Sequence, residues 1–201
     1  MSLTELVDFF QEVNALKRTK RYSTCSDSVR DSSADHSWRL ALMTIDVADK
    51  LKLTVDVPYA TKLAICHDIC EYRDENDIDS FDVARGLVSK DDKRKAEQEV
   101  MEYLASQFNR PEIYRMWLDF EESTSQEAKY VKALDKIEAQ LHLIESNGLN
   151  HQGGGEHSVL YADKAVLAFP QVLPLLKEVK KRLKAVFEAE GLKWKPEYDR
   201  V

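Results

Sequence analysis

Apolar residues recur every three or four positions along most of this 201-residue chain, which is the spacing of amphipathic α-helices. No segment of comparable length alternates apolar and polar residues with the two-residue period of a half-buried strand. The spacing predicts helices at about 3–16, 33–51, 58–71, 90–108, 111–122, 126–147 and 171–189. We therefore expect an all-α protein in which helices pack against helices.

A chain of this length can bury a conventional core within one domain. We expect a single domain over residues 1–201, with a helical core at about 3–148, a flexible loop at 149–157, C-terminal helices at 158–189 and a polar tail at 190–201. The loop follows the helix-ending pair Asn147-Gly148 and contains a glycine run, which favours turns. Its two histidines, His151 and His157, are expected to be solvated.

The charge balance and the apolar runs exclude several classes of partner. The formal net charge of −7 disfavours a protein that must neutralise many nucleic-acid phosphates, although the basic cluster at 17–21 suits one small phosphorylated ligand. No apolar run approaches the roughly 18–20 residues that span a bilayer, and the first residues lack the pattern of a secretory signal. We expect a cytoplasmic protein without nucleic-acid or membrane partners.

A His-Asp dipeptide, His67-Asp68, is accompanied by His36 upstream and Asp135 downstream. Two imidazoles and two carboxylates form a mixed ligand set that suits one divalent ion with room for water and substrate. Asp135 lies within an apolar helical stripe, where an unpaired carboxylate is costly, so it needs a cation or a hydrogen-bond network. Lys132, one helical turn earlier, is an alternative partner. The combination of residues, rather than any one of them, predicts a metal site.

Glu71 follows the dipeptide by one helical turn. If residues 58–71 form one helix, His67 and Asp68 project about 100° apart and reach a common ion over the edge between their two faces. Glu71 would then lie beside the same ion, where its carboxylate can act on a water molecule or hold a second ion.

The order His36, His67-Asp68, Asp135 resembles the signature of the HD-domain metal-dependent phosphohydrolases, an all-helical superfamily. Within it, the chain is most similar to the YfbR-type 5'-deoxynucleotidase branch. The segments that carry the resemblance are Leu16-Lys17-Arg18 with Arg21, Asp35-His36-Ser37, His67 to Glu71 and Glu127 to Asp135. The resemblance implies a helical bundle with a divalent ion between its central helices, held by His36, His67, Asp68 and Asp135.

The resemblance also assigns roles around that ion. It implies that Arg21 orients the substrate phosphate, for which a planar and permanently charged guanidinium is suited. Tyr22 matches an aromatic residue near the sugar, and Asp68 and Asp135 also border the substrate. Arg39, one turn after His36, is a further candidate for the phosphate, with an exposed helical arginine as the alternative.

Glu71 and Asp77 are the implied catalytic groups that manage protons, and Asp77 also borders the substrate. The family carries Gly-Asp-Ile or Gly-Asp-Leu shortly after the glutamate, whereas this chain has Asn76-Asp77-Ile78 one residue later and without the glycine. Asp74 and Asp79 therefore compete with Asp77 for the match.

The implied reaction is metal-assisted hydrolysis of (deoxy)ribonucleoside 5'-monophosphates to nucleoside and phosphate. The ligand set suits Mn, Co, Ni, Fe or Zn without choosing among them, and the resemblance implies a Co-, Mn- or Mg-dependent activity. The resemblance further implies that the protein forms a homodimer. It also implies that the protein binds a small nucleotide as its substrate. Two alternatives stay open. One is an HD-type phosphohydrolase for a cyclic nucleotide or another phosphorylated metabolite, and the other is a non-catalytic helical module for dimerisation and metal or ligand binding.

Overall fold

The regular structure is helical, as the apolar spacing predicts, in a computed structural model that describes residues 2–21, 30–73, 83, 86–145 and 155–201. The α-helices are α1 (Leu3–Val13), α2 (Ser33–Leu51), α3 (Val57–Cys66), α5 (Lys90–Gln107), α6 (Pro111–Glu122), α7 (Gln126–Glu145), α8 (Gly155–Leu160), α9 (Asp163–Ala168) and α10 (Leu173–Ala189). Short 3₁₀ helices cover Asn14–Lys17, Ile69–Arg73, Pro170–Val172 and Pro196–Asp199. The predicted all-α class is confirmed.

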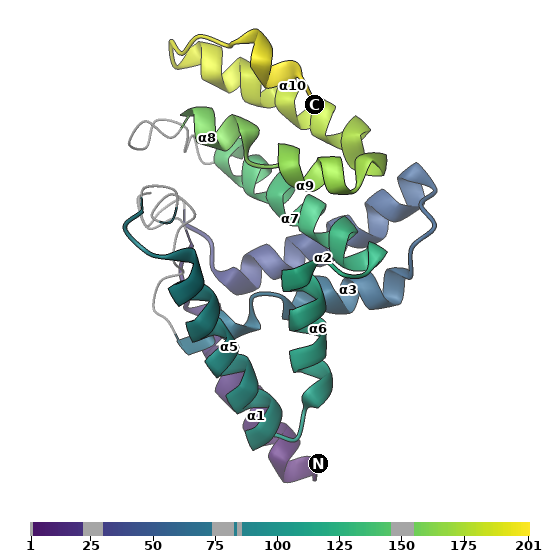
Figure 1. The fold of residues 1–201 in the computed structure, drawn as a ribbon, viewed down its shortest axis with the longest axis vertical. Helices are drawn as coiled ribbons and strands as arrows, with labels where there is room; N and C mark the ends of the chain where they lie inside the picture. The colour runs from purple at the N-terminus through teal and green to yellow at the C-terminus, as the bar shows by residue number, and fades with distance from the viewer. Residues whose placement is uncertain (1, 22–29, 74–82, 84–85, 146–154) are drawn as a thin grey trace.

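Helices α2, α3 and α7 cross in the middle of the molecule (Figure 1). Helices α1, α5 and α6 extend toward the end that carries the N-terminus, and α8, α9 and α10 form the opposite end. The central helices share a buried core that includes Leu40, Leu63, Tyr130, Leu134 and Leu176. Each such side chain contributes about 1.5–3 kcal/mol of burial free energy, so the three helices are held firmly relative to one another.

The N-cap of helix α2 is Ser32. Ser33 and Asp35 are also residue types that favour this position, but they lie within the first turn. The Ser32 hydroxyl accepts a hydrogen bond from the Asp35 N–H at 3.1 Å, and the Asp35 carboxylate accepts one from the Ser32 N–H at 2.9 Å. This capping box satisfies two otherwise unpaired amides and fixes His36 in the first turn.

Helix α3 ends at Cys66, so the expected single helix through Glu71 is wrong. His67 is the C-cap residue, and a separate 3₁₀ helix carries Glu71. The Glu71 N–H donates to the Asp68 carbonyl at 3.0 Å, and the Thr19 hydroxyl donates to the Glu71 carbonyl at 3.0 Å. The tightened turn thus depends on a contact with a distant part of the chain, which helical periodicity does not reveal.

Helix α1 buries one aromatic side chain, and His157 is less exposed than expected. In α1 the buried residue is Phe9, which packs edge-on against Phe108, whereas Leu3, Val7 and Phe10 are 81%, 53% and 58% exposed. His157 is half-buried in α8, with its ring 5.4 Å from the ring of Tyr161, rather than solvated. His151 lies outside the described residues. None of the helices that the structure describes is long and apolar enough to cross a membrane.

Candidate metal centre

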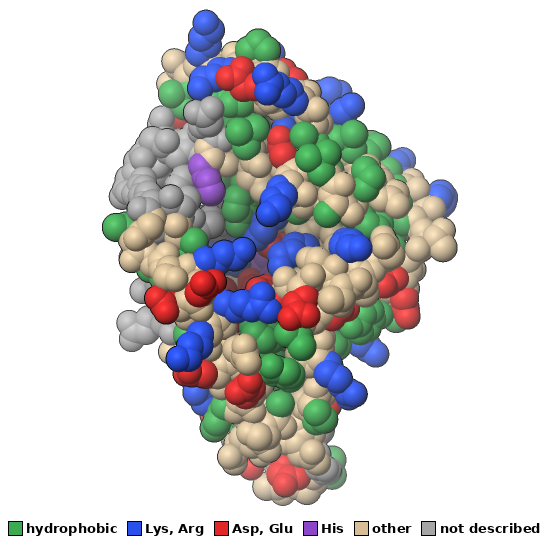
Figure 2. Space-filling view, in the orientation of Figure 1, with side chains coloured by type: hydrophobic (Ala, Val, Ile, Leu, Met, Phe, Trp, Pro, Cys, Tyr) green, Lys and Arg blue, Asp and Glu red, His purple; other side chains and the backbone are tan. Residues whose placement is uncertain are grey.

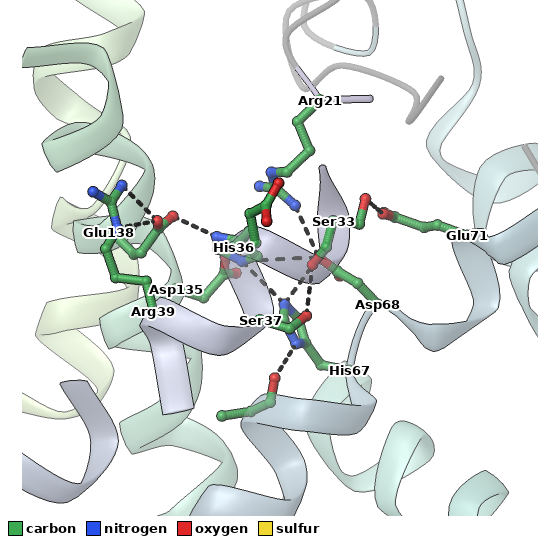
Figure 3. Close-up of polar contacts among 12 residues, drawn as sticks. Arg21, Ser33, His36, Ser37, Arg39, His67, Asp68, Glu71, Asp135 and Glu138 are labelled. Atoms are coloured by element: carbon green, nitrogen blue, oxygen red, sulfur yellow. Dashed lines mark hydrogen bonds and ion pairs between the residues drawn. The ribbon is translucent and has the colours of Figure 1, made fainter. Parts of the chain in front are cut away.

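Two imidazoles meet where α2 approaches the end of α3 (Figure 3). The Nε2 atoms of His36 and His67 lie 3.3 Å apart, and both side chains are buried. The Nδ1 atom of His67 lies 3.0 Å from the Ala64 carbonyl, which can only accept, so Nδ1 carries the proton in neutral His67. His36 Nδ1 bonds the Glu138 carboxylate. Both rings therefore direct Nε2 lone pairs at one point.

Two carboxylates converge on the same point. Asp135 Oδ1 lies 3.2 Å from His36 Nε2, and Asp68 Oδ2 lies 3.1 Å from His67 Nε2 and 3.8 Å from His36 Nε2. Ligands about 2.0–2.2 Å from one ion are roughly 3.0–3.5 Å apart at octahedral or tetrahedral angles. The donors of His36, His67 and Asp135 all lie within 4.8 Å of one another. Three of the four predicted ligands therefore meet at spacings that fit a divalent ion, and Asp68 lies against the two imidazoles at 3.1 Å and 3.8 Å.

Buried charge makes this point attractive to a cation. Burial and the positive charge of Arg21 lower the pKa of His36, but the carboxylates of Glu138 and Asp135 outweigh them and raise it to about 9. Burial raises the pKa of Glu138, yet His36 and the two arginines Arg21 and Arg39 lower it to about 2. The site therefore favours positive charge on or beside His36.

Glu138 is a functional residue that the sequence analysis missed. Its carboxylate is fully buried on α7, one turn after Asp135, and it fixes the ring of His36 from behind. A carboxylate that accepts the second N–H of a metal-binding histidine sets the tautomer and raises the basicity of the ligand nitrogen. The available signal was the Asp135–Glu138 spacing, which places both carboxylates on one face of a helix.

The cation beside Asp135 is Lys136, and the alternative that named Lys132 is wrong. Lys136 Nζ lies 2.9 Å from Asp135 Oδ2. Lys132 instead donates to the carbonyls of Phe120 and Glu121 at 3.2 Å each, at the C-terminal end of α6, and lies 3.5 Å from the Glu121 carboxylate. Burial raises the pKa of Asp135, but Lys136 and His36 hold it well below its usual range.

Arg21 reaches the cluster from a short antiparallel bridge between Lys20 and Ser32. The Arg21 N–H donates to the Asp31 carbonyl at 3.0 Å, which fixes the backbone ahead of α2. Arg21 Nη1 then lies 2.8 Å from Asp68 Oδ2. Burial raises the pKa of Asp68, but the charges of His67 and Arg21 hold it well below its usual range. The expected phosphate-binding arginine is therefore at the candidate site.

Arg39 pairs with two carboxylates of α7 rather than with Asp68. Its guanidinium binds Glu138 Oε1 at 2.6 Å and also pairs with Glu145. Arg39 therefore supports the carboxylate behind His36, and its assistance to Arg21 at the phosphate stays a prediction.

Glu71 lies on the side of Asp68 that faces away from Asp135 (Figure 3). Its carboxylate is buried, and Oε2 accepts a hydrogen bond from the Ser33 hydroxyl at 2.7 Å. Tyr22, Asp74, Asp77 and Asp79 lie outside the described residues, as does most of the predicted loop at 149–157.

The chain is similar to known proteins over most of its length. A family model described as HD domain matches residues 13–167. The 5'-deoxynucleotidase HDDC2 of Danio rerio is 29% identical over 182 residues, which cover 88% of this chain and 87% of that protein. The human 5'-deoxynucleotidase HDDC2 is also 29% identical, over 87% of this chain and 84% of its own length.

A solved structure has the same fold. It is a predicted metal-dependent phosphohydrolase from Magnetospirillum magnetotacticum, with a TM-score of 0.73, 21% identity and 96% coverage of both chains. The family model matches residues 13–167, and His36, His67 and Asp135 converge with Asp68 beside His67, so the chain belongs to the HD-domain family.

Proposed function

We propose that this chain is a metal-dependent phosphohydrolase that cleaves nucleoside 5'-monophosphates, with a preference for the deoxy form. The observation that carries the proposal is the convergence of His36, His67 and Asp135, with the Asp68–Arg21 pair in contact with His67. The relatives named 5'-deoxynucleotidases, which match 87–88% of the chain, supply the substrate class.

The chain's own residues prepare the site for a phosphate monoester. A divalent ion, when bound, supplies positive charge that polarises a phosphoryl oxygen and lowers the pKa of a water molecule. His36 and His67 in their neutral forms, with the ionised carboxylates of Asp68 and Asp135, would hold this ion. The donor set accepts Co, Mn, Mg, Zn, Ni or Fe, and it does not select one of them.

Arg21 holds the substrate phosphate in this proposal. Its guanidinium carries five N–H donors and stays charged at every physiological pH, so it can bind Asp68 and phosphoryl oxygens at the same time. Negative charge that shifts among the phosphoryl oxygens in the transition state is then opposed by a cation that is already in position.

Glu71 handles the proton. As the water oxygen attacks phosphorus and the bond to the 5'-oxygen breaks, one proton leaves the water and one is needed by the departing alcohol. The Glu71 carboxylate accepts the first and returns it to the 5'-oxygen. Ser33 orients the carboxylate by binding Oε2. By the family resemblance Asp77 shares this task, and both assignments are proposals.

A matrix of nucleotides and metals tests the function. Metal-free protein is reconstituted with each candidate ion, and phosphate release is measured from deoxy- and ribonucleoside 5'-monophosphates, 3'-monophosphates, cyclic nucleotides and nucleoside triphosphates. We expect the fastest release from deoxynucleoside 5'-monophosphates and none from Asp68→Ala. Equal rates for 5'- and 3'-monophosphates, or no release with any ion, would sink the proposal. Sedimentation of the same sample tests the predicted homodimer.

A further inference from the structure

The ammonium of Lys136 is a second cationic side chain beside the candidate metal site, and it pairs with Asp135. Lys136 Nζ is 2.9 Å from Asp135 Oδ2, while Oδ1 of the same carboxylate faces His36 Nε2 at 3.2 Å. The ammonium is therefore one carboxylate away from the point where the imidazoles converge. Arg21 has the corresponding place on Asp68. Asp68 and Asp135 lie on different sides of the two imidazoles (Figure 3), so the cations approach from two directions.

In the part of the chain that the structure describes, the ammonium of Lys136 has more N–H donors than acceptors around it. An ammonium has three N–H donors, and Lys136 directs two of them at Asp135 and at the Tyr161 hydroxyl, which is 3.1 Å away. Among the described residues the third has no acceptor, and the side chain is 27% exposed. If Lys136 served only to neutralise Asp135, its side chain would not need to be accessible to solvent.

Tyr161 adds a second donor at the same place. Because an ammonium can only donate, the Tyr161 oxygen accepts from Lys136, and the hydroxyl proton points elsewhere. The Tyr161 ring also lies 4.9 Å from Lys136 Nζ, which holds the ammonium in position. Lys and Arg side chains gather around a hollow in the middle of this face, near the crossing of α2 and α7 (Figure 2).

We propose that Lys136, supported by Tyr161, is a second binding group for the phosphate of the substrate and for the inorganic phosphate that is released. A phosphate monoester has three non-bridging oxygens. Arg21 and Lys136 can therefore each contact one of them, while the third faces the metal-ligating side chains. The inference rests on the proposed function for the substrate and names how its phosphate is held.

Lys132 is a matched control on the same helix. It lies one turn before Lys136 and is also half-buried, but its ammonium is engaged by the Phe120 and Glu121 carbonyls and lies 4.6 Å from the Phe120 ring. A substitution of Lys132 removes the same charge from the same helix without removing a donor near Asp135.

The probe is inorganic phosphate, and its binding is measured by calorimetry on metal-reconstituted protein. Lys136→Gln keeps a donor for Asp135 but removes the charge. We expect phosphate to bind about 10- to 100-fold more weakly, the KM for a deoxynucleoside 5'-monophosphate to rise by a similar factor, and metal affinity to change less than about threefold. Lys136→Arg should keep most of the phosphate affinity, and Lys132→Gln should keep all of it.

Unchanged phosphate affinity in Lys136→Gln would overturn the inference. A loss of phosphate binding that merely follows a loss of metal would also overturn it, because Lys136 would then serve Asp135 alone. Tyr161→Phe is a second variant in case Lys136→Gln does not fold. It leaves every charge in place and should weaken phosphate binding by a smaller factor than Lys136→Gln does. If wild-type protein hydrolyses no nucleotide but binds phosphate through Lys136, the proposed function fails and the inference stands.

Discussion

The Nε2 atoms of His36 and His67 face each other across 3.3 Å, and each ring has its other nitrogen bound to a protein acceptor. Two lone pairs that point at each other in a buried site repel, and the nearby carboxylates of Asp68 and Asp135 add negative charge. A cation between them removes the repulsion. The arrangement is therefore strained without a positive charge and stabilised by one.

Removal of metal is expected to lower the thermal stability of the protein. Binding to the folded state alone stabilises it by about 4 kcal/mol when free metal is a thousandfold above the dissociation constant. Thermal unfolding with chelator and with each added ion measures the effect. His67→Ala serves as the control, because its stability should no longer depend on added metal. An identical unfolding temperature with chelator and with every ion would contradict the prediction.

Glu138→Gln is expected to weaken metal binding by about 10- to 100-fold, because Glu138 orients His36 and increases the basicity of its ligand nitrogen. Metal titration of the folded variant measures the change. Glu145→Gln is the matched control: Glu145 also pairs with Arg39 from the same helix, but it is exposed and does not contact His36. Equal metal affinities in the two variants would show that Glu138 acts only through Arg39.

The sequence predicted the helices and the four converging side chains because both depend on local spacing or on a short ordered signature. Asp135 stood out as a carboxylate in an apolar stripe. Its partner did not, since Lys132 and Lys136 are both close to it on a helix and only the packing of α6 against Lys132 separates them.

Two further features that the sequence did not predict depend on long-range contacts. The turn that carries Glu71 is held by Thr19, and Glu138 is recognisable only once His36 lies against it. Neither contact produces a periodic pattern of residues in the sequence. Positions 22 and 77 lie outside the described residues, so their roles stay predictions.

Without metal, stability is expected to fall as the pH rises from about 6.5 to 9. Histidine has an ordinary pKa near 6.5, whereas the folded protein raises that of His36 to about 9. Protonated His36 thus stabilises the fold fully below pH 6.5, and this contribution, of the order of 3 kcal/mol, is lost as the pH rises through 9. Urea unfolding in chelator at pH 6, 7.5 and 9 measures it. The same slope in His36→Gln would assign the effect to another group.

Ser33→Ala is expected to lower kcat about tenfold with little change in KM. The Ser33 hydroxyl is buried and donates to Glu71 Oε2 at 2.7 Å, so its loss removes a hydrogen bond that orients the carboxylate toward the reacting water. Removing one partner of a buried charged hydrogen bond also costs about 1–3 kcal/mol of stability. Steady-state kinetics across pH, together with urea unfolding, measure both effects.

Ser37→Ala separates positioning from stability. Ser37 lies one turn later on α2, is also buried, and donates its hydroxyl to the Ser33 carbonyl at 2.8 Å rather than to Glu71. Ser33→Thr retains a hydroxyl and should restore most of the rate. If Ser33→Ala and Ser37→Ala reduce kcat equally, the loss comes from a weakened helix α2, and Ser33 has no specific role in orienting Glu71.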